Sequence, residues 1–431
     1  MVSRRCFLKV LPLGGVALSA CMKDRSQRQK PHVVCILVDQ LRKDAADRWL
    51  ERIGPIASRG VIFEQMRSVA PWTYPSVISM LSGLYPQQHG ADGHMFKNVL
   101  ATFERRVPLL QKTLRADGYE TAAFITNPFL HTWNHFRMGF DHFDAHFIGS
   151  QGNIRGRGDL VWKPGTMFAD SVNQAVTSHF SGRRCRSREF TYVHYIDVHG
   201  PWQGAPFKHR YKDAVSFIDQ RIHELYDFFM ERYDGDLLFF VTSDHGRYLK
   251  DDLEIGYGPE WRQSKKSMHD FNLRIPFMIL PSRRLTTRRT ISEPCLNFDF
   301  APTVLDWLGI EMPFRSPAVS LMPMIRGEPL NGSNRGLYAR NSAFGYLSDC
   351  LIHRNKKYVR FYDPRSKALR QRRIFDLDRD PREIRSKGED FTRISSMLDL
   401  AAGYHGLKYR AVFDAVGRET EDKLRTLGYL R

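Results

Sequence analysis

Five residues from three separate segments carry the chemical groups for metal-assisted attack on an anionic ester. Asp39 and Gln40 follow one apolar run, and Asp244 and His245 follow another, while Thr73 lies just before a Pro-Ser helix start. Two carboxylates, an amide oxygen and an imidazole suit one divalent ion such as Mg, Mn, Ca or Zn. Such an ion activates a hydroxyl as a nucleophile. The pattern predicts attack by Thr73 on a metal-bound ester.

Each of these residues also has an ordinary structural interpretation. An Asp at the end of a strand commonly caps a helix or shapes a turn, and Thr73 alone would be read as the N-cap of the following helix. The functional hypothesis therefore depends on all three segments meeting in space.

The segments between these residues predict the elements that must bring them together. Residues 33–38 and 237–241 are continuous apolar runs, which is typical of strands buried on both faces of a parallel sheet. Further strands are predicted over 121–125, 190–196 and 277–280, and helices over 75–82, 109–114, 215–229 and 302–308. Strands that alternate with helices indicate an α/β fold with a mostly parallel central sheet flanked by helices. Reactive groups collect at the carboxyl ends of such strands, where Asp39, His199 and Asp244 are expected.

The pattern changes after residue 310. Short strand-like pieces at 358–362 and 373–377 alternate with basic turns, and a helix is predicted near 389–402. We therefore expect a catalytic domain over 31–310 and a smaller C-terminal α+β domain over 311–431.

The N-terminus has the composition of an export signal. Arg4 and Arg5 precede a short apolar run that ends in Leu-Ser-Ala-Cys21. Residues 1–21 therefore predict a signal peptide of the twin-arginine and lipoprotein type, followed by a polar tether over 22–30. The expected location is the bacterial periplasm or cell envelope, with the protein anchored to the membrane through lipidated Cys21.

Composition limits the partners. The chain has 431 residues and a formal net charge of +18, which favours acidic partners. No nucleic-acid-binding motif accompanies that charge, so nucleic acid is not expected to bind. A phosphorylated or sulfated glycan or lipid remains the expected partner class, and the sequence leaves the oligomeric state open.

Blocks of sequence along the chain resemble the sulfatase branch of the alkaline-phosphatase superfamily. The resemblance runs from about residue 31 to the C-terminus, in order. It rests on VCILVDQLR (34–42), WTYPSVISMLSGLYPQQHG (72–90), RADGYET (115–121), YVHYIDVHGPW (192–202), FFVTSDHG (239–246), NLRIPFMIL (272–280), APTVLDWLG (301–309) and IFDLDRDPRE (374–383). It implies an alkaline-phosphatase-like fold.

The resemblance also implies roles for individual residues. It makes Asp39, Gln40, Asp244 and His245 the metal ligands and Thr73 both a ligand and the nucleophile. It makes His199 a contact to the substrate oxygens or the leaving group, His269 a further catalytic residue, and Lys265 or Lys266 a contact to the transferred group.

Three departures from the sulfatase pattern bear on the reaction. Sulfatases of this branch have a Cys or Ser that is oxidised to formylglycine where this chain has Thr73, and an Arg where it has Val77. The usual Lys-Trp-His contacts are replaced by the stretch 126–129. A threonine nucleophile is similar to the phosphotransferase and phosphodiesterase members of the superfamily.

The sequence therefore predicts an exported metal-dependent hydrolase or transferase that acts on a phosphate ester or diester through Thr73. One alternative is a sulfuric ester hydrolase. A second alternative, from a different class, is a non-catalytic lipoprotein that binds an anionic glycan or lipid.

Overall fold

A computed structural model describes most of the chain. The described residues are 30–92, 99–130, 135–145, 168–200, 205–208, 210–249, 267–330, 335–342, 345–386, 396–399, 402 and 412–415. The predicted signal peptide and most of the helix predicted near 389–402 lie outside them. Within them, no helix combines the length and apolarity that crossing a bilayer requires.

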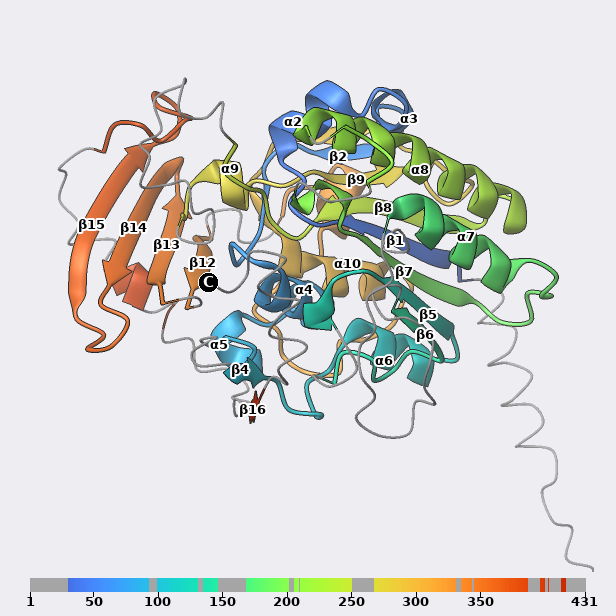
Figure 1. The fold of residues 1–431 in the computed structure, drawn as a ribbon, viewed down its shortest axis with the longest axis horizontal. Helices are drawn as coiled ribbons and strands as arrows, with labels where there is room; N and C mark the ends of the chain where they lie inside the picture. The colour runs from blue at the N-terminus through green and yellow to red at the C-terminus, as the bar shows by residue number, and fades with distance from the viewer. Residues whose placement is uncertain are drawn as a thin grey trace, which may run out of the picture.

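A central mixed sheet of eight strands organises the larger part of the molecule (Figure 1). In spatial order the strands are β10 (Arg289–Ile291), β2 (Val61–Phe63), β9 (Phe277–Leu280), β8 (Leu237–Ser243), β1 (His32–Val38), β7 (Glu189–Tyr195), β5 (Glu120–Ile125) and β6 (His142–Ala145). Strand β9 runs antiparallel to β8 and β2, and the other pairs are parallel. The predicted α/β fold with a mostly parallel sheet is confirmed.

Helices cover both faces of this sheet and enclose two hydrophobic cores. The central strand β1 is buried along its whole length, and its side chains alternate between the cores: Cys35 and Leu37 enter one, Val34 and Ile36 the other. The first core is covered by α4 (Thr73–Ser82), α6 (Leu110–Ala116), α10 (Phe300–Trp307) and α11 (Met322–Arg326). The second is covered by α2 (Lys43–Trp49), α3 (Ile53–Ala57), α7 (Ala169–Phe180) and α8 (Tyr211–Arg232). Figure 1 shows α7 and α8 on one side of the sheet and α4 and α10 on the other.

A second sheet follows in the chain and packs beside the first. Its four antiparallel strands are β12 (Leu337–Asn341), β13 (Leu347–His353), β14 (Lys356–Tyr362) and β15 (Leu369–Asp376). Buried Lys357 of β14 joins it to the larger body, because its ammonium group lies 2.8 Å from Asp270 and 2.7 Å from Glu383. Asp270 also pairs with Arg67 at 2.6 Å. Asp270 opens the short helix α9 (Asp270–Leu273), which Figure 1 places between the two sheets. The predicted domain boundary between residues 310 and 311 stays a prediction.

Smaller pairings complete the described fold. Strand β3 (Met66–Arg67) pairs with β11 (Cys295–Leu296), and β4 (Val99–Thr102) pairs with β16 (Val412–Ala415). Helix α5 (Pro86–His89) follows α4, which ends at Gly83 in a left-handed conformation (φ 69°) that glycine adopts without strain. Cys35, Cys185, Cys295 and Cys350 are free thiols.

Candidate active site

The ends of β1 and β8 bring the two predicted carboxylates together. These strands pair in parallel with Val38 opposite Ser243, so Asp39 and Asp244 leave adjacent strands at the same edge. Both side chains are fully buried. A buried carboxylate is costly unless it is paired, hydrogen-bonded or bound to a metal, so the contacts of these two groups decide what the site can hold.

Asp244 is held by backbone donors on one side only. Its Oδ1 accepts hydrogen bonds from the amides of Gln40 at 3.1 Å and His245 at 2.8 Å. Its buried Oδ2 accepts none from the described residues. Gln40 takes a left-handed backbone conformation (φ 63°), which is uncommon for a residue other than glycine and is concentrated at functional sites. The local backbone thus fixes Asp244 with one oxygen turned to the interior of the site.

Thr73 is the first residue of α4, directly after its N-cap Trp72. Its hydroxyl lies 3.4 Å from Asp39 Oδ2 and 3.5 Å from His245 Nε2. The helix start is pinned to the β8 loop, since the Ser76 hydroxyl donates to the Asp244 carbonyl oxygen at 2.7 Å. The positive end of the helix dipole therefore faces the place where an anionic ester would lie.

Asn127 completes this cluster and was not among the predicted site residues. It follows β5, and its Nδ2 donates to Asp39 Oδ2 at 2.6 Å and lies 3.4 Å from the Thr73 hydroxyl. A signal for it exists in the sequence, since a polar residue after an apolar strand is the same pattern that identified Asp39. In the sequence alone, the stretch 126–129 is identified only as a departure from the sulfatase contacts.

The ring of His245 is oriented as a metal ligand requires. Its Nδ1 lies 2.6 Å from the Gly246 carbonyl oxygen, which only accepts, so Nδ1 carries the proton and Nε2 the lone pair. Nε2 lies 3.6 Å from Asp244 Oδ2 and 3.8 Å from Asp39 Oδ1. Asp39, Asp244 and His194 also each offer a ligand atom within 4.8 Å of the others.

This donor set fits a divalent ion. Two buried carboxylates face each other beside an imidazole lone pair, and the buried Oδ2 of Asp244 has no hydrogen bond within the described part of the chain. A cation bound among them would satisfy these acceptors, because buried charges are paired or coordinate metals. The role of the Gln40 side chain as a ligand stays a prediction.

His199 lies close to the same loop. It ends the 3-10 turn η3 (Asp197–His199), and the guanidinium of Arg247 donates to its carbonyl oxygen at 2.5 Å and to that of Val198 at 3.1 Å. Arg247 comes directly after the Asp-His-Gly segment. These hydrogen bonds therefore hold η3 next to Asp244 and His245. Arg247 was not predicted, although a cation next to Asp-His-Gly was visible in the sequence.

His269 is placed at the junction of the two sheets. Its Nδ1 lies 2.6 Å from the Ser267 hydroxyl, and its ring stacks on Phe271. Burial, reinforced by the charge of Lys357, lowers the pKa of His269 to about 3, so the ring is neutral. Its predicted catalytic role stays a prediction. Lys265 and Lys266 lie outside the described residues.

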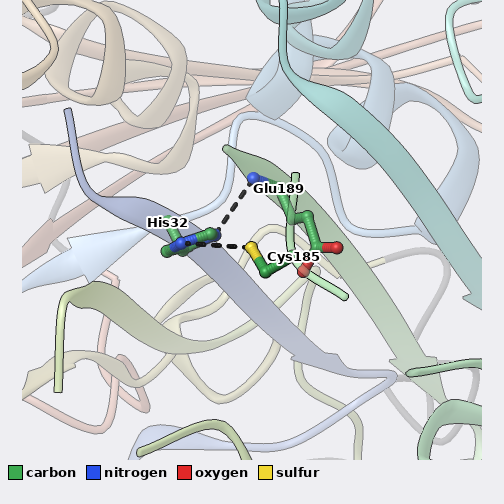
Figure 2. Close-up of side chains that lie close together, drawn as sticks. All are labelled: His32, Cys185 and Glu189. Carbon is green, nitrogen blue, oxygen red and sulfur yellow. Dashed lines mark hydrogen bonds between the residues drawn. The ribbon is translucent and has the colours of Figure 1, made fainter. Parts of the chain in front are cut away.

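A second group of metal-type side chains lies at the opposite end of β1 (Figure 2). The Glu189 amide donates to His32 Nδ1 at 3.1 Å, so the proton of the neutral ring sits on Nε2, which faces Cys185 Sγ at 3.7 Å. The Glu189 carboxylate is bonded to Tyr233 at 2.5 Å and to Arg232 at 3.2 Å. These donors already have partners, so we assign no metal to this group.

Sequence profiles of known families match most of the chain. The profile described as "Sulfatase" matches residues 31–310, and the profile described as "N-sulphoglucosamine sulphohydrolase, C-terminal" matches residues 260–400.

Two curated relatives and one solved structure show what the chain is similar to. It is 21% identical to a Delta 4,5-hexuronate-2-O-sulfatase of Bacteroides thetaiotaomicron, over 96% of this chain and 94% of that protein. It is 25% identical to an N-acetylglucosamine-6-O-sulfatase of the same organism over 42% of this chain, and it spans about a third (32%) of that relative's length. A phosphonate monoester hydrolase from Silicibacter pomeroyi shares the fold, with a TM-score of 0.62 and 17% identity over 93% of this chain and 96% of that one.

Proposed function

Because the chain belongs to the sulfatase family, we propose that it is a metal-dependent hydrolase that cleaves a sulfate ester of an acidic glycan, with Thr73 as the nucleophile. The observation that carries this proposal is the Thr73 hydroxyl at the start of α4, 3.4 Å from Asp39 and 3.5 Å from His245. The names of both curated relatives favour the sulfate ester over the phosphate ester predicted from Thr73 alone.

The residues of the site have different proposed roles. Asp39, Asp244 and His245 would hold a divalent ion, which supplies Lewis acidity that lowers the pKa of a nearby hydroxyl. Asp39 Oδ2 lies 3.4 Å from the Thr73 hydroxyl and accepts its hydrogen bond. Asn127 holds that same oxygen and keeps the carboxylate aimed at Thr73.

The proposed reaction has two stages. The Thr73 hydroxyl gives its proton to Asp39 Oδ2 as its oxygen bonds to the sulfur, the bond from sulfur to the sugar oxygen breaks, and the leaving oxygen takes a proton from His199. Water then attacks the sulfur of the threonine sulfate and gives a proton to His199, the bond from sulfur to the Thr73 oxygen breaks, sulfate leaves, and the proton on Asp39 returns to the Thr73 oxygen. The dipole of α4 stabilises the negative charge that builds on the sulfate oxygens.

A phosphate or phosphonate ester is the second candidate substrate. Thr73 is the observation that favours it, because an unmodified hydroxyl lacks the aldehyde hydrate by which formylglycine sulfatases release sulfate. Val77 replaces the usual arginine and is fully buried in the first core. The side chain at this position therefore brings no cation to the transferred group.

A matched panel of nitrophenyl sulfate, phosphate, phosphodiester and phosphonate esters tests the proposal. We expect the sulfate ester to give the highest kcat/KM with added divalent ion, and Thr73→Val to remove that activity. A wide margin in favour of a phosphorus ester would replace the first candidate with the second. Absence of turnover together with tight binding of a sulfated glycan would favour the non-catalytic alternative.

We also propose that the protein works in the cell envelope, anchored through Cys21. The motif Leu-Ser-Ala-Cys after a short apolar run supports this location. Cys21→Ala should abolish incorporation of labelled palmitate and move the protein from the membrane to the soluble fraction. Equal membrane association of both forms would contradict the anchor.

A further inference from the structure

His194 is a buried imidazole that the proposed reaction does not use. It is the penultimate residue of β7, which lies between β1 and β5 in the sheet, opposite Leu37 and Ile125. The side chain is completely buried, and neither ring nitrogen has a hydrogen-bond partner within the described residues.

Burying a polar group without a hydrogen bond destabilises the folded state. His89 is a buried histidine whose two ring nitrogens both have hydrogen-bond partners. Its Nε2 lies 2.9 Å from the Ser79 hydroxyl and its Nδ1 accepts the Ala91 amide at 3.0 Å. His194 has no such bonds within the described chain, so its position needs another explanation.

The ring of His194 meets the two carboxylates of the site. One of its nitrogens lies within 4.8 Å of an oxygen of Asp39 and of Asp244. An imidazole beside two carboxylates is a common ligand set for a transition-metal ion.

We propose that His194 is a ligand of the divalent ion, contributed by a third strand beside Asp39 and Asp244. This inference rests on the proposed function only in that both require the ion. With His194 the ion gains a nitrogen donor, which favours Zn²⁺ over Ca²⁺, because Ca²⁺ prefers oxygen ligands alone.

His194→Leu is the direct test, because leucine keeps much of the volume and removes both nitrogens. Metal-free wild type, His194→Leu and His89→Leu would be titrated with Zn²⁺, Mn²⁺ and Ca²⁺ by calorimetry. Loss of even an indirect metal contact weakens binding by about 10–100-fold, so we expect at least a tenfold rise in the Zn²⁺ Kd for His194→Leu. His89→Leu should leave that Kd within about twofold.

Two further readouts separate a ligand from a structural histidine. The Tm of metal-free His194→Leu should equal or exceed that of wild type, because an unsatisfied polar group is removed, whereas His89→Leu should lower it. In the Co²⁺-loaded protein, His194→Leu and His194→Gln should shift the visible absorption bands. If His194→Leu fails to fold, His194→Gln carries the same titration.

The outcomes distinguish this inference from the proposed function. An unchanged Zn²⁺ Kd and Co²⁺ spectrum in both His194 variants would overturn the inference alone, provided that Asp244→Asn weakens binding. A wild type that binds none of the three ions would overturn both. Preference for Ca²⁺ over Zn²⁺ would also contradict a nitrogen ligand.

Discussion

Replacing Asn127 by alanine tests whether the site depends on how Asp39 is held. Asn127 is buried and donates to Asp39 Oδ2 at 2.6 Å. A hydrogen bond to a charged group contributes about 1.5–3 kcal/mol. If that contribution is fully present in the transition state, its loss lowers kcat/KM by about 10- to 150-fold, at about 1.36 kcal/mol for each factor of ten.

The assay is kcat/KM on the best nitrophenyl ester, measured with the thermal midpoint of each variant. Asn173→Ala is the matched control, because Asn173 of α7 is also a buried asparagine. It donates to the Arg221 carbonyl oxygen at 2.8 Å and accepts from the Tyr195 hydroxyl at 2.5 Å. We expect Asn173→Ala to lower Tm but to leave kcat/KM within about twofold.

A second substitution sharpens the result. Asn127→Asp keeps the shape but places another carboxyl group against Asp39, so we expect a larger loss of activity than in Asn127→Ala above neutral pH. Like charges in contact disfavour ionisation, so part of the activity should return as pH falls. Wild-type kcat/KM in Asn127→Ala, with an unchanged Tm, would refute the reasoning.

The remaining predictions concern the nucleophile, the ion and the core. Thr73→Val should lower kcat by at least about 1000-fold with little change in Tm, and mass spectrometry of the 67–90 peptide should show an unmodified threonine; persistent turnover would make Thr73 only a helix-start residue. Removal of divalent ions by a chelator should lower Tm and activity together, and Zn²⁺ or Mn²⁺ should restore both; unaltered Tm and turnover would speak against a bound ion. Burial lowers the pKa of His89 to about 3, so the unfolded state binds the proton more readily between pH 3 and 6.5 and stability rises with pH in that window. In urea titrations, the free energy of unfolding should fall by about 2 kcal/mol more in the wild type than in His89→Gln when the pH is lowered from 7.5 to 5. An equal fall in both proteins would contradict a buried neutral ring.

Local sequence patterns predicted the main elements of the fold well. The apolar runs predicted over 33–38 and 237–241 lie within the central strands β1 and β8, and the apolar period from Val215 to Phe229 lies within α8. The predicted start of α4 at Pro75 was late by two residues, because the helix begins at Thr73 itself. The described part of the C-terminal region is dominated by the four-stranded sheet, of which two strands were predicted.

The sequence by itself determined that Asp39 and Asp244 end buried strands and that Thr73 starts a helix, because hydrophobic runs and helix starts are local properties of the chain. Only the tertiary structure decided that Asn127 and His194 join them. Asn127 follows β5, and His194 is near the end of β7. These strands come to lie near β1 through the order β8-β1-β7-β5, which depends on how helices pack over both faces of the sheet. Asn127 reaches Asp39 across 88 residues of chain, a contact that no local pattern encodes.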